Sequence, residues 1–66
     1  MRPCNRSLEE TISLTETMLA LSEKGDIARE DDGCGILYGV LRDSAYKIRK
    51  MAEAEKDAHK KKGKWE

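Results

Sequence analysis

In the second half of the chain, a row of mostly apolar residues recurs at alternating steps of three and four, and this spacing constrains the fold most. The row consists of Cys34, Leu37, Leu41, Ser44, Ile48, Met51, Glu55 and Ala58. Residues with this period lie along one side of an α-helix and form the contact seam of a coiled coil. Tyr38, Ala45 and Ala52 flank the row at seven-residue intervals. The pattern predicts one long helix that packs lengthwise against another helix.

An earlier segment has a helix start, an apolar side and a helix end. Ser7 and Glu10 have the spacing of a capping box, in which each side chain reaches the backbone amide of the other residue. Gly25 suits the left-handed residue that ends a helix. Between them, the following residues fall on one broad side: Leu8, Ile12, Thr15, Met18 and Leu19, with Leu14 and Leu21 at its edge. We predict a helix over residues 7–24, after a lead-in over residues 1–6.

The second helix is predicted over residues 31–62, after a connector over residues 25–30. Asp31 or Asp32 can cap its first turn, and its lysine-rich end loses apolar content, which predicts a solvated overhang that frays near Gly63. Gly35, Gly39 and Tyr46 fall together away from the apolar side, which favours a contact surface there. Because a short connector makes the two helices antiparallel, we predict a single all-α domain over residues 1–66, an antiparallel helical hairpin.

Composition agrees with exposed helices around a thin aliphatic core. Charged residues make up 39% of the chain, which has one proline and no phenylalanine. No apolar run approaches the roughly 18 residues of a membrane span, and the first residues lack the apolar stretch of a secretory signal. We therefore expect a cytoplasmic protein that does not associate with a membrane.

The apolar arc of the second helix is too wide for one neighbouring helix to cover. A chain of this length buries only about 60% of the surface that its unfolded form exposes, so its own core is marginal. A second hairpin would cover the surplus, which predicts a homodimer in the form of a four-helix bundle. The residues predicted for this self-association face are Leu37, Leu41, Ile48, Met51, Ile36 and Val40.

Charge divides the chain into two halves. Residues 1–33 contain four basic and eight acidic side chains, and residues 34–66 contain nine basic and five acidic ones. In an antiparallel pair of hairpins, each acidic turn would meet the basic end of its partner, so charge would select this orientation. The net charge of zero argues against a general nucleic-acid binder, which would be basic overall.

The two cysteines are predicted to lie at opposite ends of the hairpin. Cys4 and Cys34 would then be separated by far more than the ~7 Å Cα distance that a disulfide bridges. We interpret Cys34 as a packed residue, because free cysteines are among the most buried residue types. A reactive or metal-binding thiol at the start of the second helix stays open as an alternative.

No arrangement of residues indicates catalysis or a bound cofactor. His59 is the only histidine, and we interpret Glu55 and His59, one helical turn apart, as a surface pair. The sequence lacks the Gly-x-Ser-x-Gly motif of serine hydrolases, the Walker loop and the glycine pattern of dinucleotide-binding enzymes. We predict a protein without enzymatic activity, with no catalytic, cofactor-binding or metal-ligating residues.

Two functions remain, and both involve binding. The first is a homodimeric association or regulatory protein that binds another macromolecule, and a protein is the partner that we expect. The alternative is a small nucleic-acid-binding regulator, in which basic side chains neutralise phosphates and an aromatic ring stacks on a base. The residues predicted for nucleic-acid contact are Lys60, Lys61, Lys62, Lys64 and Trp65.

Overall fold

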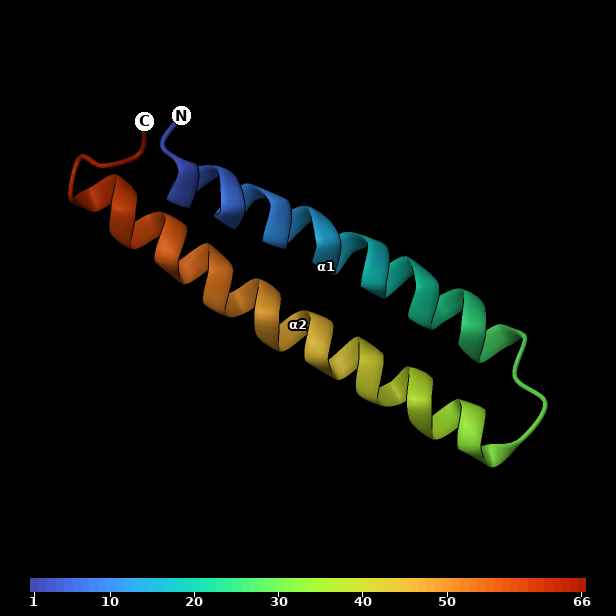
Figure 1. Ribbon diagram of the computed structural model, residues 1–66. Helices are drawn as coiled ribbons and strands as arrows, with labels where there is room; N and C mark the ends of the chain where they lie inside the picture. Colours follow the sequence, from blue (N-terminus) through green and yellow to red (C-terminus); the bar gives the residue numbers. More distant parts are fainter.

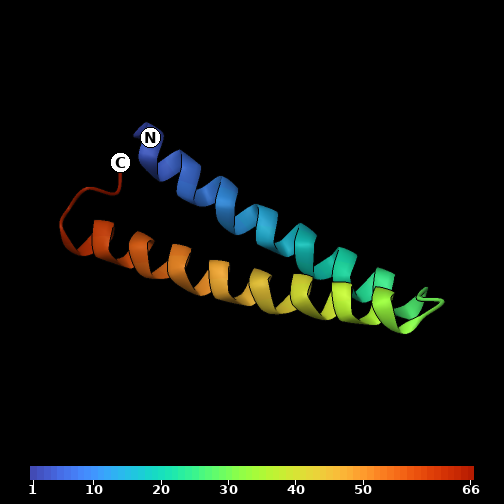
Figure 2. The same ribbon diagram turned by 60° about the horizontal axis from the view of Figure 1, so that its bottom comes forward.

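The computed structural model describes residues 1–66 and contains two helices, α1 (Pro3–Ile27) and α2 (Asp32–Lys61). The helices run antiparallel, with both chain ends at one end of the molecule and the turn at the other (Figure 1). A view turned by 60° shows the same two-helix arrangement (Figure 2). The predicted all-α helical hairpin is confirmed. Neither helix has a stretch both long and apolar enough to cross a membrane.

Helix α1 begins one turn earlier than predicted. Pro3 occupies its first position, where the fixed φ of proline suits a helix and the missing amide hydrogen costs nothing. Ser7 therefore lies inside the helix, and its carbonyl oxygen accepts a hydrogen bond from the Thr11 hydroxyl at 2.8 Å. The predicted capping box at Ser7 is wrong, and so is the lead-in from Pro3 onward.

Helix α1 also continues past Gly25, which we predicted to end it. Gly25 lies inside the helix, and the ring of Tyr38 from α2 occupies the space where a Cβ atom on Gly25 would stand. The missing side chain therefore allows the two helices to approach, and it does not mark a helix end. The connector is correspondingly shorter than predicted and lies between Ile27 and Asp32.

The start of α2 agrees with the prediction. Asp31 caps the helix, and its Oδ1 atom accepts a hydrogen bond from the backbone amide of Cys34 at 2.8 Å. This backbone hydrogen bond stabilises the ionised carboxylate and lowers the pKa of Asp31 below its ordinary value. Of the two predicted caps, Asp31 is the one that the structure uses.

The fully buried side chains between the helices are small or polar. The buried residues are Asn5, Thr15 and Ser22 on α1, and Ala45 and Ala52 on α2. The Thr15 hydroxyl donates to the carbonyl oxygen of Ile12 at 2.6 Å, and the Ser22 hydroxyl donates to that of Leu19 at 2.8 Å. Since both hydroxyls are satisfied within α1, they can be buried without a partner on α2.

The contact seam of α2 lies one residue after the row that we predicted. Ala45 and Ala52, predicted to flank that row, face α1, whereas Leu37 and Met51 are 58% and 61% exposed. Side chains as small as alanine, serine and threonine let two helices pack closely at these positions. Leu37 and Met51 therefore lie outside the seam, while the ring of Tyr38 packs into it against Gly25.

The hairpin is elongated and buries little of its surface. Its extents are 48 × 16 × 12 Å, and its radius of gyration is 14.9 Å, against about 11 Å for a compact domain of this length. Its accessible surface is 5060 Å², compared with about 4,200 Å² for a compact monomer of this mass. Only five of the 66 residues are buried, so much apolar surface remains available to a partner.

Candidate functional site

Large apolar side chains of both helices project to the same side of the hairpin. On α1, Leu14 and Leu21 each come directly before a buried residue of the seam. On α2, Leu37 and Met51 come directly before Tyr38 and Ala52, which lie on the side of α2 toward α1. Because the helices are antiparallel, positions one residue before the seam lie on the same side of it in both. They form one continuous surface.

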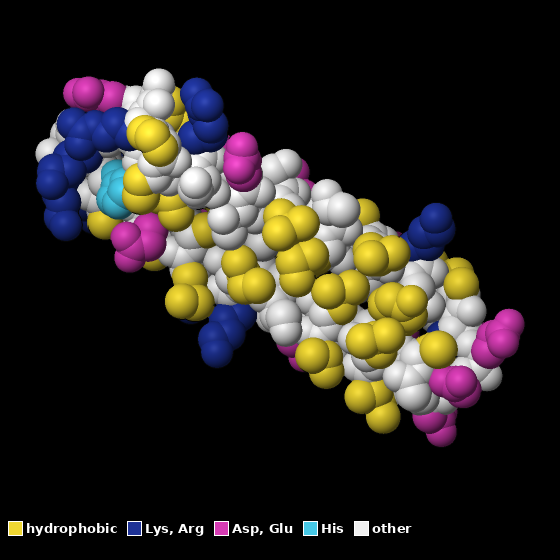
Figure 3. Space-filling model, in the orientation of Figure 1, with side chains coloured by type: hydrophobic (Ala, Val, Ile, Leu, Met, Phe, Trp, Pro, Cys, Tyr) yellow, Lys and Arg dark blue, Asp and Glu magenta, His cyan; other side chains and the backbone are white.

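We call this surface the apolar face and define it by Leu14, Met18, Leu21, Leu37, Val40, Leu41, Ile48 and Met51. Hydrophobic side chains cover the middle and the turn-proximal part of the hairpin on this side (Figure 3). Most of these residues are exposed, while Met18 and Leu41 are half-buried at the edge of the seam.

Five of the six residues predicted for self-association belong to the apolar face. They are Leu37, Val40, Leu41, Ile48 and Met51. The sixth, Ile36, is 69% exposed and lies by its helical position on the side of α2 away from α1. Leu14 and Leu21, predicted at the edge of the apolar side of the first helix, belong to the apolar face but were not among these six residues. Association of the hairpin through these residues stays a prediction.

Charges of opposite sign gather at the two ends of the molecule. Acidic side chains surround the turn, and basic side chains surround the chain ends (Figure 3). At the turn, the one ion pair joins Arg29 to Asp26 at 3.4 Å, while Glu30, Asp31 and Asp32 have no ion-pair partner. The hairpin therefore carries an electrical dipole along its long axis.

The residues predicted for nucleic-acid contact differ in their surroundings. Lys60, Lys61, Lys62 and Lys64 are exposed, whereas Trp65 is half-buried. The Nζ atoms of Lys56 and Lys60 lie 5.1 and 5.8 Å from the centre of the Trp65 ring, within the range of cation–π attraction. The structure brings Trp65 and Lys60 together within the chain itself, so the indole already has partners.

Asn5 fastens the end of the chain to the start of α1. Its Nδ2 atom donates to the carbonyl oxygens of Lys64 and Glu66 at 2.7 and 3.2 Å, and its Oδ1 atom lies 2.7 Å from Nδ1 of His59. Since Nδ2 is the donor, Oδ1 is the acceptor, and His59 must carry a hydrogen on Nδ1. At 1% exposure, Asn5 has all its polar atoms paired.

The predicted solvated overhang is therefore wrong. The last turns of α2 pack against the first turns of α1, where Lys56 also pairs with Glu9 at 2.9 Å. After α2, Gly63 adopts a φ of +70° and turns the chain back. Sequence reasoning missed Asn5 because it placed this residue in the lead-in. The available signal was spacing, since Asn5 lies three residues before Leu8 and extends the same helical row.

The remaining candidates for chemistry stand apart from one another. Cys4 and Cys34 are both free. Cys4 lies in the first turn of α1 and Cys34 in the first turn of α2, so they stand at opposite ends of the antiparallel hairpin, as predicted. His59 Nε2 is 4.0 Å from Glu55 Oε2. No group of three or more His, Cys, Asp or Glu side chains is placed to hold a metal ion.

The geometry thus identifies the apolar face, with its oppositely charged ends, as the candidate functional surface. Comparison with protein-family models, with curated proteins and with solved structures finds no match to this chain.

Proposed function

We propose that the chain is a non-enzymatic association protein that forms a homodimeric four-helix bundle. It acts by binding another macromolecule, and the partner that we propose is a protein. One observation carries this proposal: the fully buried side chains are small or polar, while several large apolar side chains, among them Leu37 and Met51, are exposed on one face. Fully burying a leucine, valine or methionine side chain contributes about 1.5–3 kcal/mol, so covering the apolar face would add much stabilisation that the single hairpin lacks.

The exposed area supports a second copy of the chain as the occupant of the apolar face. The surface of 5060 Å² exceeds that of a compact monomer by roughly 800 Å², which is about what each partner buries in a standard protein interface. A dimer with two-fold symmetry would place the same face of each hairpin against the other. Each copy would then cover the leucines, valine and methionines of its partner.

Charge supports an antiparallel arrangement of the two hairpins. In this orientation the acidic turn of each chain lies beside the basic end of its partner, whereas a parallel arrangement would bring like charges together. Exposed ion pairs contribute only about 0–1 kcal/mol each. The charged ends would select the orientation, while the apolar face would supply the stability.

Sedimentation equilibrium of the wild-type chain and two variants tests the dimer. Leu37→Asp places a charge on the apolar face at a side chain that is 58% exposed in the hairpin, so the fold should survive. Ile27→Asp is the control, because Ile27 is 79% exposed but lies outside the apolar face. We expect dimers for the wild type and Ile27→Asp, and helical monomers for Leu37→Asp. A monomeric wild type at all concentrations would refute the dimer.

The same variants test the binding of a further macromolecule. In a pull-down, the tagged wild-type chain and tagged Ile27→Asp should retain the same protein partner. Tagged Leu37→Asp should not retain it if the dimer is the form that binds. Retention of nucleic acid alone, with affinity falling steeply as salt rises, would instead support the alternative function.

A further inference from the structure

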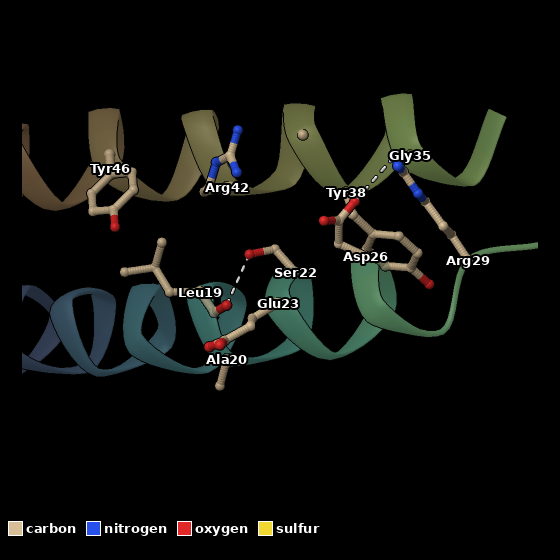
Figure 4. Close-up of a pocket in the computed structure, with 11 residues that line it drawn as sticks. Leu19, Ala20, Ser22, Glu23, Asp26, Arg29, Gly35, Tyr38, Arg42 and Tyr46 are labelled. Atoms are coloured by element: carbon tan, nitrogen blue, oxygen red, sulfur yellow. Dashed lines mark hydrogen bonds and ion pairs between the residues drawn. The ribbon is translucent and has the colours of Figure 1, made fainter. Parts of the chain in front are cut away.

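A groove opens on the flank of the hairpin opposite the apolar face. It lies between the last turns of α1 and the first half of α2 and has a cavity volume of about 540 Å³ (Figure 4). Small-molecule sites occupy about 300–1,000 Å³, so the groove is large enough for a compact ligand. Because it lies on the other flank, the proposed dimer would leave it open.

Glycines create the hollow. A Cβ atom on Gly39 would meet no atom within 4 Å, and a Cβ atom on Gly35 would meet only the flexible side chain of Arg29. Glycine inside a helix is less stable than alanine, and close packing within the hairpin does not require it at Gly39. The contact surface that the sequence favoured near Gly35, Gly39 and Tyr46 therefore coincides with this groove.

The two walls of the groove carry opposite charges. Arg42 projects from α2 and Glu23 from α1 (Figure 4). Glu23 takes part in none of the ion pairs of the chain, and the only ion-pair partner of Arg42 is the adjacent Asp43 at 3.8 Å, whose side chain is 80% exposed. Farther toward the turn, Asp26 and Arg29 pair with each other. Glu23 is thus unpaired, and Arg42 is paired only with an exposed neighbour that a ligand carboxylate can displace.

Aromatic surface lies beside these charges. Tyr38 and Tyr46 both line the groove, and the hydroxyl of Tyr46 points toward α1 (Figure 4). Tyrosine rings offer apolar area for an aliphatic or aromatic group, with a polar tip at the end. The groove therefore combines an open floor, two rings, a guanidinium and a carboxylate.

We propose that this groove binds a free α-amino acid with an apolar or aromatic side chain. The planar guanidinium of Arg42 matches a carboxylate, and Glu23 on the opposite wall matches an ammonium group. The side chain of the ligand lies over Gly39 beside the tyrosine rings. A zwitterion satisfies both walls at once, which a simple anion or cation does not.

An NMR titration of the full ¹⁵N-labelled chain tests the proposal. The probe is L-phenylalanine, and the matched control ligand is N-acetyl-L-phenylalaninamide, which has the same side chain but neither charge. We expect saturable shifts of the Gly35, Gly39 and Tyr46 amides with L-phenylalanine, and at least tenfold weaker binding of the neutral compound. Equal binding of both compounds, or no shift with L-phenylalanine, would overturn the proposal.

Three variants locate the site. Arg42→Gln should weaken binding at least tenfold, whereas Lys47→Gln, which removes the same charge from an exposed position outside the groove, should not change it. Gly39→Leu should abolish binding by filling the hollow while the chain stays helical. Unchanged binding in Gly39→Leu, or equal losses in Arg42→Gln and Lys47→Gln, would place the ligand elsewhere. Leu37→Asp should still bind L-phenylalanine. Binding of the ligand in the groove can therefore be tested whether or not the chain forms the proposed dimer.

Discussion

Asn5 and His59, which are 54 residues apart in sequence, meet at 2.7 Å between Asn5 Oδ1 and His59 Nδ1. The same amide also donates to the carbonyl oxygens of Lys64 and Glu66, so one buried side chain joins the start of α1, the end of α2 and the last residues. A buried polar group with all its hydrogen-bond partners stabilises a structure modestly. When one partner is removed, the buried group left unpaired destabilises the fold by its full free energy of desolvation.

Replacing Asn5 with alanine should therefore destabilise the hairpin by about 1–3 kcal/mol. The substitution removes the hydrogen-bond acceptor of His59 Nδ1 and the donor to the carbonyl oxygens of Lys64 and Glu66. Urea unfolding measures the loss, and the emission of Trp65 should shift to longer wavelength as the last residues detach. Ser13→Ala, at an exposed position of α1, is the control and should change neither. Equal stability of Asn5→Ala and the wild type would contradict the hydrogen-bond network.

Two glycine substitutions should have opposite effects. Gly39→Ala should stabilise the chain by about 0.5–1 kcal/mol, because the new methyl group meets no atom and alanine favours a helix. Gly25→Ala should destabilise it by about 1–3 kcal/mol, because the ring of Tyr38 occupies the space of the added Cβ atom. Thermal unfolding by circular dichroism measures both. If Gly25→Ala were the more stable variant, Tyr38 would not pack there.

Asp31 should contribute stability that depends on pH. Its pKa in the folded chain lies below the ordinary value of 3.8 because its carboxylate accepts a hydrogen bond from the backbone amide of Cys34. The stabilisation is therefore complete above the ordinary pKa and is lost as the pH falls toward the lower, folded value. Asp31→Asn is the matched variant, since asparagine also caps a helix but does not titrate.

Unfolding by urea at a series of pH values between about 6 and 2 measures this difference. The wild type should lose more stability than Asp31→Asn on acidification below about pH 4. Parallel stability curves for the two chains would show that the cap does not favour the ionised form of Asp31.

The proposed dimer should make thermal stability depend on protein concentration. Because dissociation accompanies unfolding, a tenfold rise in concentration should raise Tm by about 5 °C in the wild type. Leu37→Asp should show a constant Tm over the same range. A constant Tm for the wild type would contradict association coupled to folding.

The indole of Trp65 should take no part in binding single-stranded nucleic acid while the end of the chain is folded back. Lys56 and Lys60 already lie over the ring, which leaves it less open to stacking by a base. We expect the fluorescence of Trp65 to stay unchanged when oligothymidine is added. Quenching that weakens as salt rises would favour the nucleic-acid alternative, since base stacking and phosphate contact would then occur together.

The sequence by itself determined the two helices, their antiparallel order, an aspartate cap at Asp31 or Asp32 and the separation of the two cysteines. Each of these follows from local rules: the period of a helix, the preference of aspartate for a cap and the short connector. The apolar side of α1 was also recognisable, because Thr15 and Ser22 fall within the same helical row as Leu8 and Ile12.

Only the tertiary structure decided which row of α2 faces α1. The row that contains Leu37 and Met51 and the row that contains Ala45 and Ala52 have nearly the same period. Periodicity alone does not determine how closely the two backbones approach. Once Ala45 and Ala52 face α1, Leu37 and Met51 fall outside the seam and lie on the apolar face.

The helix ends were also decided by contacts across the hairpin. Gly25 lies inside α1 with the ring of Tyr38 packed against it, and Asn5 is buried where residues more than 50 positions away supply its hydrogen bonds. Such pairings depend on the three-dimensional register of the two helices. A local pattern cannot encode a partner that only folding brings near.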